Sequence, residues 1–130
     1  MVLSKDGGAI PKMEIPFKLG VAGKIADGKQ YMSWIHVDDL VSQFVFLLEH
    51  DSDKTVFNGV APNPVTNTEF TKTMGQVLKR PTFFKAPKSI LKVALGEMSS
   101  VLLNGQKVVP KNFIEAGYKF EYTHLKNALD

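Results

Sequence analysis

Along the chain, the clearest pattern of hydrophobic and polar positions is a strand-like alternation followed directly by helical spacing. The alternating aromatic, small and β-branched side chains from Tyr31 to Val37 predict a strand. Asp38 or Asp39 is expected to cap a helix that ends near Glu49 or His50, because a carboxylate there accepts a hydrogen bond from a free backbone N–H. The apolar positions at helical spacing, typical of a helix that packs on a core, are Leu40, Val41, Phe44, Val45, Leu47 and Leu48.

A second strand and helix are predicted in the middle of the chain. Thr55 to Val60 is the strand candidate. The tetrapeptide from Thr66 has the form of a capping box, with Thr66 as the N-cap residue and Glu69 at the third helical position. The helix is expected to stop before Pro81. The side chains that it is expected to bury are Phe70, Met74, Val77 and Leu78.

The first thirty residues carry weaker signals. The tripeptide Val2-Leu3-Ser4 is similar to the end of a strand. Ala9 to Leu19 is apolar, but Pro11 and Pro16 interrupt it, so short helical turns and loop are expected there. The glycine-containing segment 20–30 is expected to be flexible.

The last third of the chain is predicted to be helical. Pro87 can open a helix at its first turn. A short helix is predicted over 110–116 with Gly117 closing it, and Thr123 is expected to cap a last turn through Leu129. The inner positions of the helix after Pro87 and its expected terminator are Ile90, Leu91, Ala94, Leu95, Met98, Val101, Leu102 and Gly105.

These elements predict an α/β protein that is rich in helix, with about four or five helices and two or three short strands. So few strands do not make a stable parallel sheet alone. The length of 130 residues fits one domain, residues 1–130, with a core of its own.

Composition narrows the class of protein. No apolar run approaches the roughly 18 residues of a membrane helix, and the first residues lack a basic segment followed by an apolar one, so no secretory signal is expected. Cysteine is absent, so disulfides and thiolate metal sites are excluded and a cytoplasmic location is expected. The net charge of +3 comes from scattered lysines, which argues against a nucleic-acid surface because such surfaces concentrate their charge.

Two sequence motifs resemble known sites but lack the required context. Residues 23–30 nearly match a P-loop, yet Gln30 stands where a hydroxyl must hold magnesium, and a strand follows in place of a helix. Tyr122 and Lys126 match the Tyr-x-x-x-Lys pair of short-chain dehydrogenases, but no dinucleotide fold precedes them. No G-x-G-x-x-G fingerprint is present either, so we expect no cofactor to be held by this chain.

The stretch SWIHVDDL at 33–40 combines a tryptophan, a histidine and two carboxylates. A metal site would need distant assembly, because His36, His50 and His124 lie far apart in the sequence. We expect His36 to be a strand-end histidine bonded to backbone, with a ligand-binding or basic role as the alternative. The stretch is therefore interpreted as a junction of strand and helix, in which Trp34 is a candidate wall of a substrate pocket.

Several blocks carry a resemblance to a known family. They are VLSKDGGAIPKM at 2–13, GKQYMSWIHVDDLV at 28–41, VFNGVAPNPVTNTEF at 56–70, VLKRP at 77–81, LGEMSSVLLNGQKVVP at 95–110 and EAGYKF at 115–120. In this order they resemble the C-terminal half of an atypical extended short-chain dehydrogenase/reductase, of the epimerase family protein or NAD-dependent epimerase/dehydratase-like branch.

The resemblance implies a substrate-binding lobe whose partner, a Rossmann half with the glycine fingerprint and catalytic Tyr-x-x-x-Lys, is missing. NAD or NADP is implied for the full-length family protein. The chain is expected to be a domain of a longer protein or the product of a truncated gene. The implied substrate-binding residues are Met13, Phe17, Gln30, Trp34 and His36.

One departure bears on the substrate. Many sugar-nucleotide members of the wider family have Arg-Asp in this strand, where arginine can bind a phosphate with two hydrogen bonds. Here Met32 and Ser33 occupy those positions, so Gln30 and Trp34 favour a smaller or more apolar ligand.

Three functions are therefore considered. The first is the substrate-binding domain of an NAD(P)-dependent nucleoside-diphosphate-sugar epimerase-like protein or oxidoreductase, binding a small molecule and inactive alone. The alternative is a non-catalytic interaction module that forms a homodimer through an exposed apolar surface. Nucleic-acid binding rests on net charge alone, and no membrane association is expected.

Overall fold

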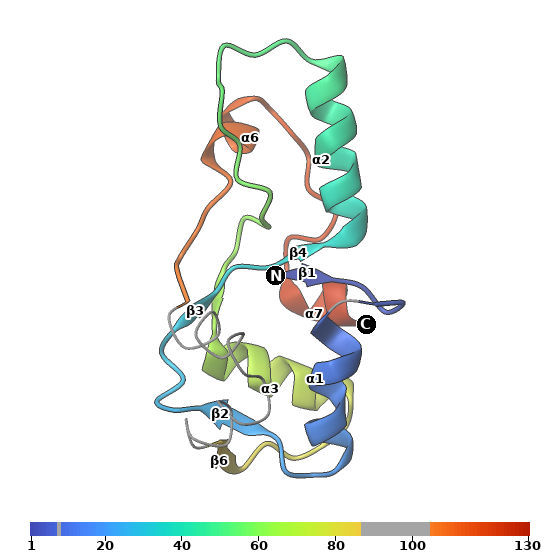
Figure 1. The fold of residues 1–130 in the computed structure, drawn as a ribbon, viewed down its shortest axis with the longest axis vertical. Coiled ribbons are helices and arrows are strands. Elements are labelled where there is room, and N and C mark those ends of the chain that lie inside the picture. The colour runs from blue at the N-terminus through green and yellow to red at the C-terminus, as the bar shows by residue number, and fades with distance from the viewer. Residues whose placement is uncertain (8, 87–104) are drawn as a thin grey trace.

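The structure, a computed structural model, describes residues 1–7, 9–86 and 105–130 (Figure 1). The helix predicted after Pro87 lies outside these residues. The described part contains five helices and six strands of two or three residues, which confirms the α/β class with a predominance of helix. In chain order the elements are β1 (Val2–Leu3), α1 (Ala9–Lys18), β2 (Gly23–Ile25), β3 (Tyr31–Met32), β4 (Ile35–His36), α2 (Val37–Glu49), β5 (Val65–Thr66), α3 (Asn67–Val77), β6 (Phe84–Ala86), α6 (Lys111–Glu115) and α7 (Leu125–Leu129).

The strands form three separate pairs. β1 pairs with β4 and β2 with β6, both parallel, and β3 pairs with β5 antiparallel. The single strand predicted from Tyr31 to Val37 is therefore wrong, because its two ends pair with different partners and Val37 already begins α2. Between the ends, the Ser33 hydroxyl donates to the carbonyl of Gln106 at 2.7 Å and accepts from the N–H of Val108 at 3.0 Å.

Other strand predictions also need correction. No strand forms over Thr55 to Val60, and the strand of this region lies later, at β5. The segment expected to be flexible contains β2, whose partner β6 was not predicted.

The main core lies among α1, α3, α7 and the strands, in the lower half of Figure 1. α1 is one helix, against the expectation of broken turns. Pro11 falls in the first turn, where its missing N–H would have no partner, and Pro16 costs one hydrogen bond, while Ile10 and Phe17 are buried. The buried core residues are Leu3, Ile10, Phe17, Ala22, Met32, Trp34, Ala61, Phe70, Met74, Leu125, Ala128 and Leu129.

α3 follows the sequence prediction closely. The Thr66 N–H donates to the Glu69 carboxylate at 2.7 Å, and the Glu69 N–H donates to the Thr66 hydroxyl at 3.2 Å, so the capping box is confirmed. Phe70 and Met74 are buried, and α3 ends before Pro81 as expected. A helix whose start is fixed by its own side chains and whose apolar side meets the core is locally encoded.

Of the predictions for the two short C-terminal helices, one is confirmed and one is wrong. α6 lies within the predicted range, and Gly117 follows it with a φ of +80°, a left-handed conformation that closes a helix. α7 begins at Leu125 with His124 at the N-cap position and no side-chain cap, so the prediction that Thr123 caps it is wrong.

α2 ends at Glu49, as predicted, but begins at Val37, earlier than a cap at Asp38 or Asp39 would allow, and its orientation is unexpected. Its buried residues are polar: Asp39 is 2% exposed and Gln43 1%. Four apolar residues, Val41, Phe44, Val45 and Leu48, are exposed instead, Phe44 to 63% and Leu48 to 87%. We call these four the α2 outer face. The inner side of α2 packs on residues 113–122, where Phe46 makes tilted and edge-on ring contacts with Phe113 and Tyr118.

Candidate functional site

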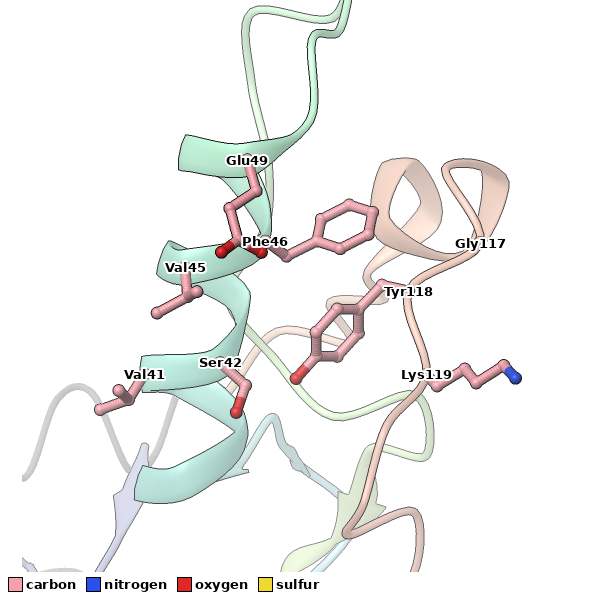
Figure 2. A pocket seen from close by; sticks show the side chains of 8 residues that line it. All are labelled: Val41, Ser42, Val45, Phe46, Glu49, Gly117, Tyr118 and Lys119. Atoms are coloured by element: carbon pink, nitrogen blue, oxygen red, sulfur yellow. The ribbon is translucent and has the colours of Figure 1, made fainter.

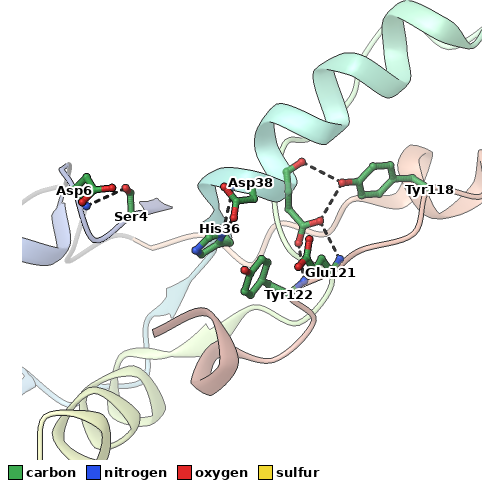
Figure 3. Close-up of polar contacts among 8 residues, drawn as sticks. Ser4, Asp6, His36, Asp38, Tyr118, Glu121 and Tyr122 are labelled. Carbon is green, nitrogen blue, oxygen red and sulfur yellow. Dashed lines mark hydrogen bonds and ion pairs between the residues drawn. The ribbon is translucent and has the colours of Figure 1, made fainter. Parts of the chain in front are cut away.

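Three polar side chains of SWIHVDDL, those of His36, Asp38 and Asp39, lie at the carboxyl end of the parallel pair β1/β4. The register sets Leu3 opposite His36, so Ser4 and Asp6, which follow β1, leave the same edge as the start of α2. In open α/β sheets this edge is where ligands bind. Figure 3 shows His36, Asp38 and Tyr122 lying together there.

His36 is the N-cap residue of α2, so the prediction that Asp38 or Asp39 caps this helix is wrong. The His36 Nδ1 accepts the Asp38 backbone N–H at 3.3 Å and lies 3.4 Å from the Asp38 carboxylate. Acceptance at Nδ1 places the proton of the neutral ring on Nε2. The ring stacks on Tyr122, with centroids 3.8 Å apart, and its side chain is 14% exposed. The expected contact of His36 with backbone is therefore present.

Asp39 holds the C-terminal segment against the start of α2. Its carboxylate accepts the Tyr118 hydroxyl at 3.0 Å, the Glu121 N–H at 3.0 Å and the Tyr122 N–H at 2.8 Å. These donors satisfy a carboxylate that is otherwise buried. By fixing the backbone of Tyr122, Asp39 also sets the ring that stacks on His36.

Both tyrosines of this segment are weak acids. Burial raises the pKa of Tyr118 to about 12, with the Asp39 carboxylate as the next cause. The pKa of Tyr122 is raised, first by desolvation and then by the charges of Glu121 and Asp38. Both hydroxyls therefore remain protonated at neutral pH and act as hydrogen-bond donors.

The five predicted substrate-binding residues do not form one cluster. Phe17 and Trp34 belong to the main core and Met13 packs against it, with the Trp34 indole N–H donating to the Asn63 carbonyl at 2.9 Å. The Gln30 amide donates to the Ile25 carbonyl at 3.4 Å. The structure thus brings three of the five together and leaves the role of all five in substrate binding a prediction.

A hollow of about 420 Å³ lies elsewhere, between α2 and the segment after α6 (Figure 2). None of the five predicted residues lines it. Sequence reasoning did not find it, because its two walls are about 70 residues apart along the chain. Its lining residues are Val41, Ser42, Val45, Phe46, Glu49, Gly117, Tyr118 and Lys119.

The described residues contain no group of three or more His, Cys, Asp or Glu side chains that could hold a metal ion. None of the described helices combines the length and apolar content that crossing a membrane takes.

Comparison with known proteins gives the family. An epimerase family protein of Staphylococcus epidermidis is 43% identical over all 130 residues, and epimerase family protein SDR39U1 of mouse is 41% identical over 99% of the chain. The crystal structure of human epimerase family protein SDR39U1 with NADPH superposes with a TM-score of 0.90 and 39% identity over 98% of the chain. The resemblance to the epimerase family is confirmed.

The match covers only part of each epimerase family protein. The chain spans 44% of the length of the S. epidermidis, mouse and human proteins. Residues 86–130 match a family model described as a domain of unknown function, DUF1731. A nucleoside-diphosphate sugar epimerase of Corynebacterium glutamicum has a TM-score of 0.73 at 26% identity, with 98% of this chain and 23% of that chain covered.

Proposed function

We propose that this chain is the substrate-binding portion of an NADP(H)-dependent epimerase-like protein or oxidoreductase, and that it is not catalytic alone. The observation that carries the proposal is the TM-score of 0.90 to a human relative whose structure was determined with NADPH. That relative is more than twice as long, since this chain covers 44% of it. We therefore assign cofactor binding and the chemical reaction to a full-length protein of the relative's kind, and not to this chain by itself.

We propose that the substrate is smaller or more apolar than a nucleotide sugar. The contacts of Met32 and Ser33 support this proposal, because both side chains serve the fold. The Met32 sulfur accepts the Asn67 side-chain amide at 3.4 Å, and the Ser33 hydroxyl bonds to the backbone of Gln106 and Val108. Neither side chain offers a charge to a phosphate, unlike arginine.

Among the five predicted residues, Gln30 and His36 are partly exposed and are proposed to contact the ligand. Phe17 and Trp34 are buried in the chain as described, so they are proposed to support the wall of the substrate site from behind, with Met13 beside them.

Calorimetric titration with NADPH tests the proposal. The isolated chain is expected to show no binding at micromolar NADPH, whereas the chain mixed with the unmatched part of the S. epidermidis relative is expected to bind it. Micromolar binding by the isolated chain, or none by the mixture, would contradict the proposal. UDP-glucose serves as the nucleotide-sugar probe for the mixture, and its saturable binding would contradict the smaller substrate.

A further inference from the structure

The loop between α2 and β5, residues 50–64, is held to the C-terminal part of the chain by asparagine side chains. The Asn58 amide donates to the Val109 carbonyl at 3.3 Å. The Asn63 amide donates to the Thr123 carbonyl at 2.9 Å. In Figure 1 the loop runs down from the end of α2 beside α6. A segment without helix or strand thus depends on neutral amides to stay in place.

Asn58 and Asn63 are alike in exposure and bonding but differ in the residue that follows. Both are exposed, and both donate to a backbone carbonyl. Asn58 precedes Gly59, which keeps its backbone N–H and has no Cβ to hinder a close approach. Asn63 precedes Pro64, which has no backbone N–H. Of the two asparagines, only Asn58 can therefore react with the N–H of the next residue.

The Gly59 N–H is available for such a reaction. It donates to no other group among the described residues, whereas the next N–H, that of Val60, donates to the Asn58 carbonyl at 2.9 Å. A contact between residues two apart is that of a γ-turn, here with Gly59 at its centre. Gly59 is also exposed, so water reaches this peptide bond. Within the described part of the chain, its nitrogen can attack without first breaking a hydrogen bond of its own.

We propose that Asn58 is a site of non-enzymatic modification, at which its side-chain amide is converted to a carboxylate. The Gly59 nitrogen attacks Cγ of Asn58, and the bond from Cγ to Nδ2 breaks. Nδ2 leaves as ammonia with the proton from the Gly59 nitrogen, and a cyclic imide remains. Water then adds to one imide carbonyl and opens the ring, so that the nitrogen regains a proton and the new carboxyl group of aspartate or isoaspartate ionises. Water is the only co-reactant, so the inference is independent of the proposed function.

The product cannot keep the contact with Val109. A carboxylate has no N–H and only accepts hydrogen bonds, as does the Val109 carbonyl, so the two groups repel each other. Asn58 follows Phe57, whose ring packs on Phe113 of α6 with centroids 4.9 Å apart. Modification is therefore expected to loosen the loop from α6 and to expose this aromatic pair.

Mass spectrometry of the tryptic peptide 55–72, which contains both asparagines, tests the chemistry. The intact chain is incubated at mildly alkaline pH before digestion. Fragment ions are expected to show the replacement of NH2 by OH about tenfold faster at Asn58 than at Asn63. Equal rates at the two residues, or no conversion of Asn58, would overturn the inference. A peptide is measured because Asn104 and Gly105 form a second Asn-Gly pair, of which Asn104 lies outside the described residues.

Gly59→Ala tests the cyclic route. A Cβ at residue 59 would lie 3.1 Å from Leu40 Cδ1 and 3.6 Å from Gln43 Oε1, so the fold accommodates it by a small shift of the leucine end. Conversion at Asn58 is expected to slow about tenfold, because the added side chain hinders the approach of the nitrogen. An unchanged rate would contradict attack by the residue 59 nitrogen.

Two substitutions test the structural consequence. Asn58→Asp carries the charge of the product, and Asn58→Gln is the matched control that keeps a neutral amide donor. Hydrogen exchange in the loop and in α6 is expected to be faster in Asn58→Asp than in the unmodified chain, and nearly unchanged in Asn58→Gln. Equal exchange in all three proteins would show that the contact with Val109 does not hold the loop, and this consequence would be wrong.

Discussion

α3 and α2 have similar caps and a similar spacing of apolar residues, but they bury opposite sides. Each follows a two-residue strand, each has its first turn fixed by a side-chain cap, and each carries apolar residues at helical spacing. In α3 the apolar side chains Phe70 and Met74 are buried. In α2 the apolar stripe is outside, and Asp39 and Gln43 are inside.

The difference shows that the spacing of apolar residues predicts a helix, but not whether its apolar side packs against the chain's own core. α3 satisfies both its polar and its apolar groups within the chain. α2 secures its position through hydrogen bonds to Asp39 and aromatic contacts of Phe46, and leaves its stripe free for another surface. Gln43, on the inner side, does not add to this anchoring, because its buried amide has no hydrogen-bond partner in the part of the chain that the structure describes.

Truncation of one phenylalanine in each helix gives the largest expected contrast. Phe70→Ala should lower the free energy of unfolding by about 3–5 kcal/mol, because it leaves a cavity in the core. Phe44→Ala should change it by less than about 0.5 kcal/mol, because the ring is already mostly in water. Urea denaturation followed by circular dichroism measures both. Similar losses for the two variants would show that the α2 outer face is covered in the isolated chain.

The two adjacent carboxylates of α2 provide the next test. Asp39→Ala removes the acceptor of two backbone N–H groups and the Tyr118 hydroxyl, so a loss of about 2–4 kcal/mol is expected. Asp38→Ala is the matched control, and its exposed carboxylate should contribute below about 1 kcal/mol.

Denaturation curves of both variants measure the two losses of unfolding free energy. Asp39→Asn keeps one accepting oxygen, so its loss should lie between those of the two alanine variants. Hydrogen exchange would show where stability is lost, with the amides of Glu121 and Tyr122 exposed first in Asp39→Ala. Equal effects of the two alanine variants would contradict the assignment of Asp39 as the anchor of the C-terminal segment.

The contrast also explains which features the sequence could predict. The capping box of Thr66 and Glu69, the end of α2 at Glu49 and the closure of α6 at Gly117 depend on residues within a few positions of one another, and each was predicted. Asp39 was misassigned because its partners lie about 80 residues away and its neighbour offers the same carboxylate. The broken strand at Ser33 has the same cause, since its hydroxyl binds the backbone of Gln106 and Val108.

For the candidate site, the local sequence indicated the junction of strand and helix at 33–40, and the family resemblance indicated five substrate-binding residues. Neither indicated the hollow between α2 and the segment after α6. The tertiary fold alone brings Val41 and Val45 opposite Tyr118. Trp34 was selected as an unusual residue, and its complete burial with a bonded indole N–H shows that a rare residue type is also a good core residue.

The smallest expected effects are in the pH dependence of stability, where the two helices should respond at opposite ends of the scale. The pKa of Glu69 is lowered by its hydrogen bonds from the Thr66 backbone and hydroxyl, so its contribution is complete above its usual pKa of 4.5 and is lost as the pH falls. The pKa of Tyr118 is raised from 10.0 to about 12, so its contribution is complete below pH 10 and is lost as the pH rises toward 12.

Two variants test which residue causes the loss of stability at low pH, the acid limb of the profile, and which causes the loss at high pH, the alkaline limb. Glu69→Gln should flatten the acid limb of the stability profile and leave the alkaline limb unchanged, because glutamine keeps the capping geometry without a titrating group. Tyr118→Phe should flatten the alkaline limb between pH 10 and 12 alone, since it removes the phenol whose proton is retained by burial and by the Asp39 contact. Thermal melts of both variants across the pH range measure the profiles. If Tyr118→Phe left the alkaline limb intact, neither the burial of the Tyr118 phenol nor its contact with Asp39 would couple this residue to stability, and α2 would depend on the two backbone N–H groups bonded to Asp39 and on the packing of Phe46.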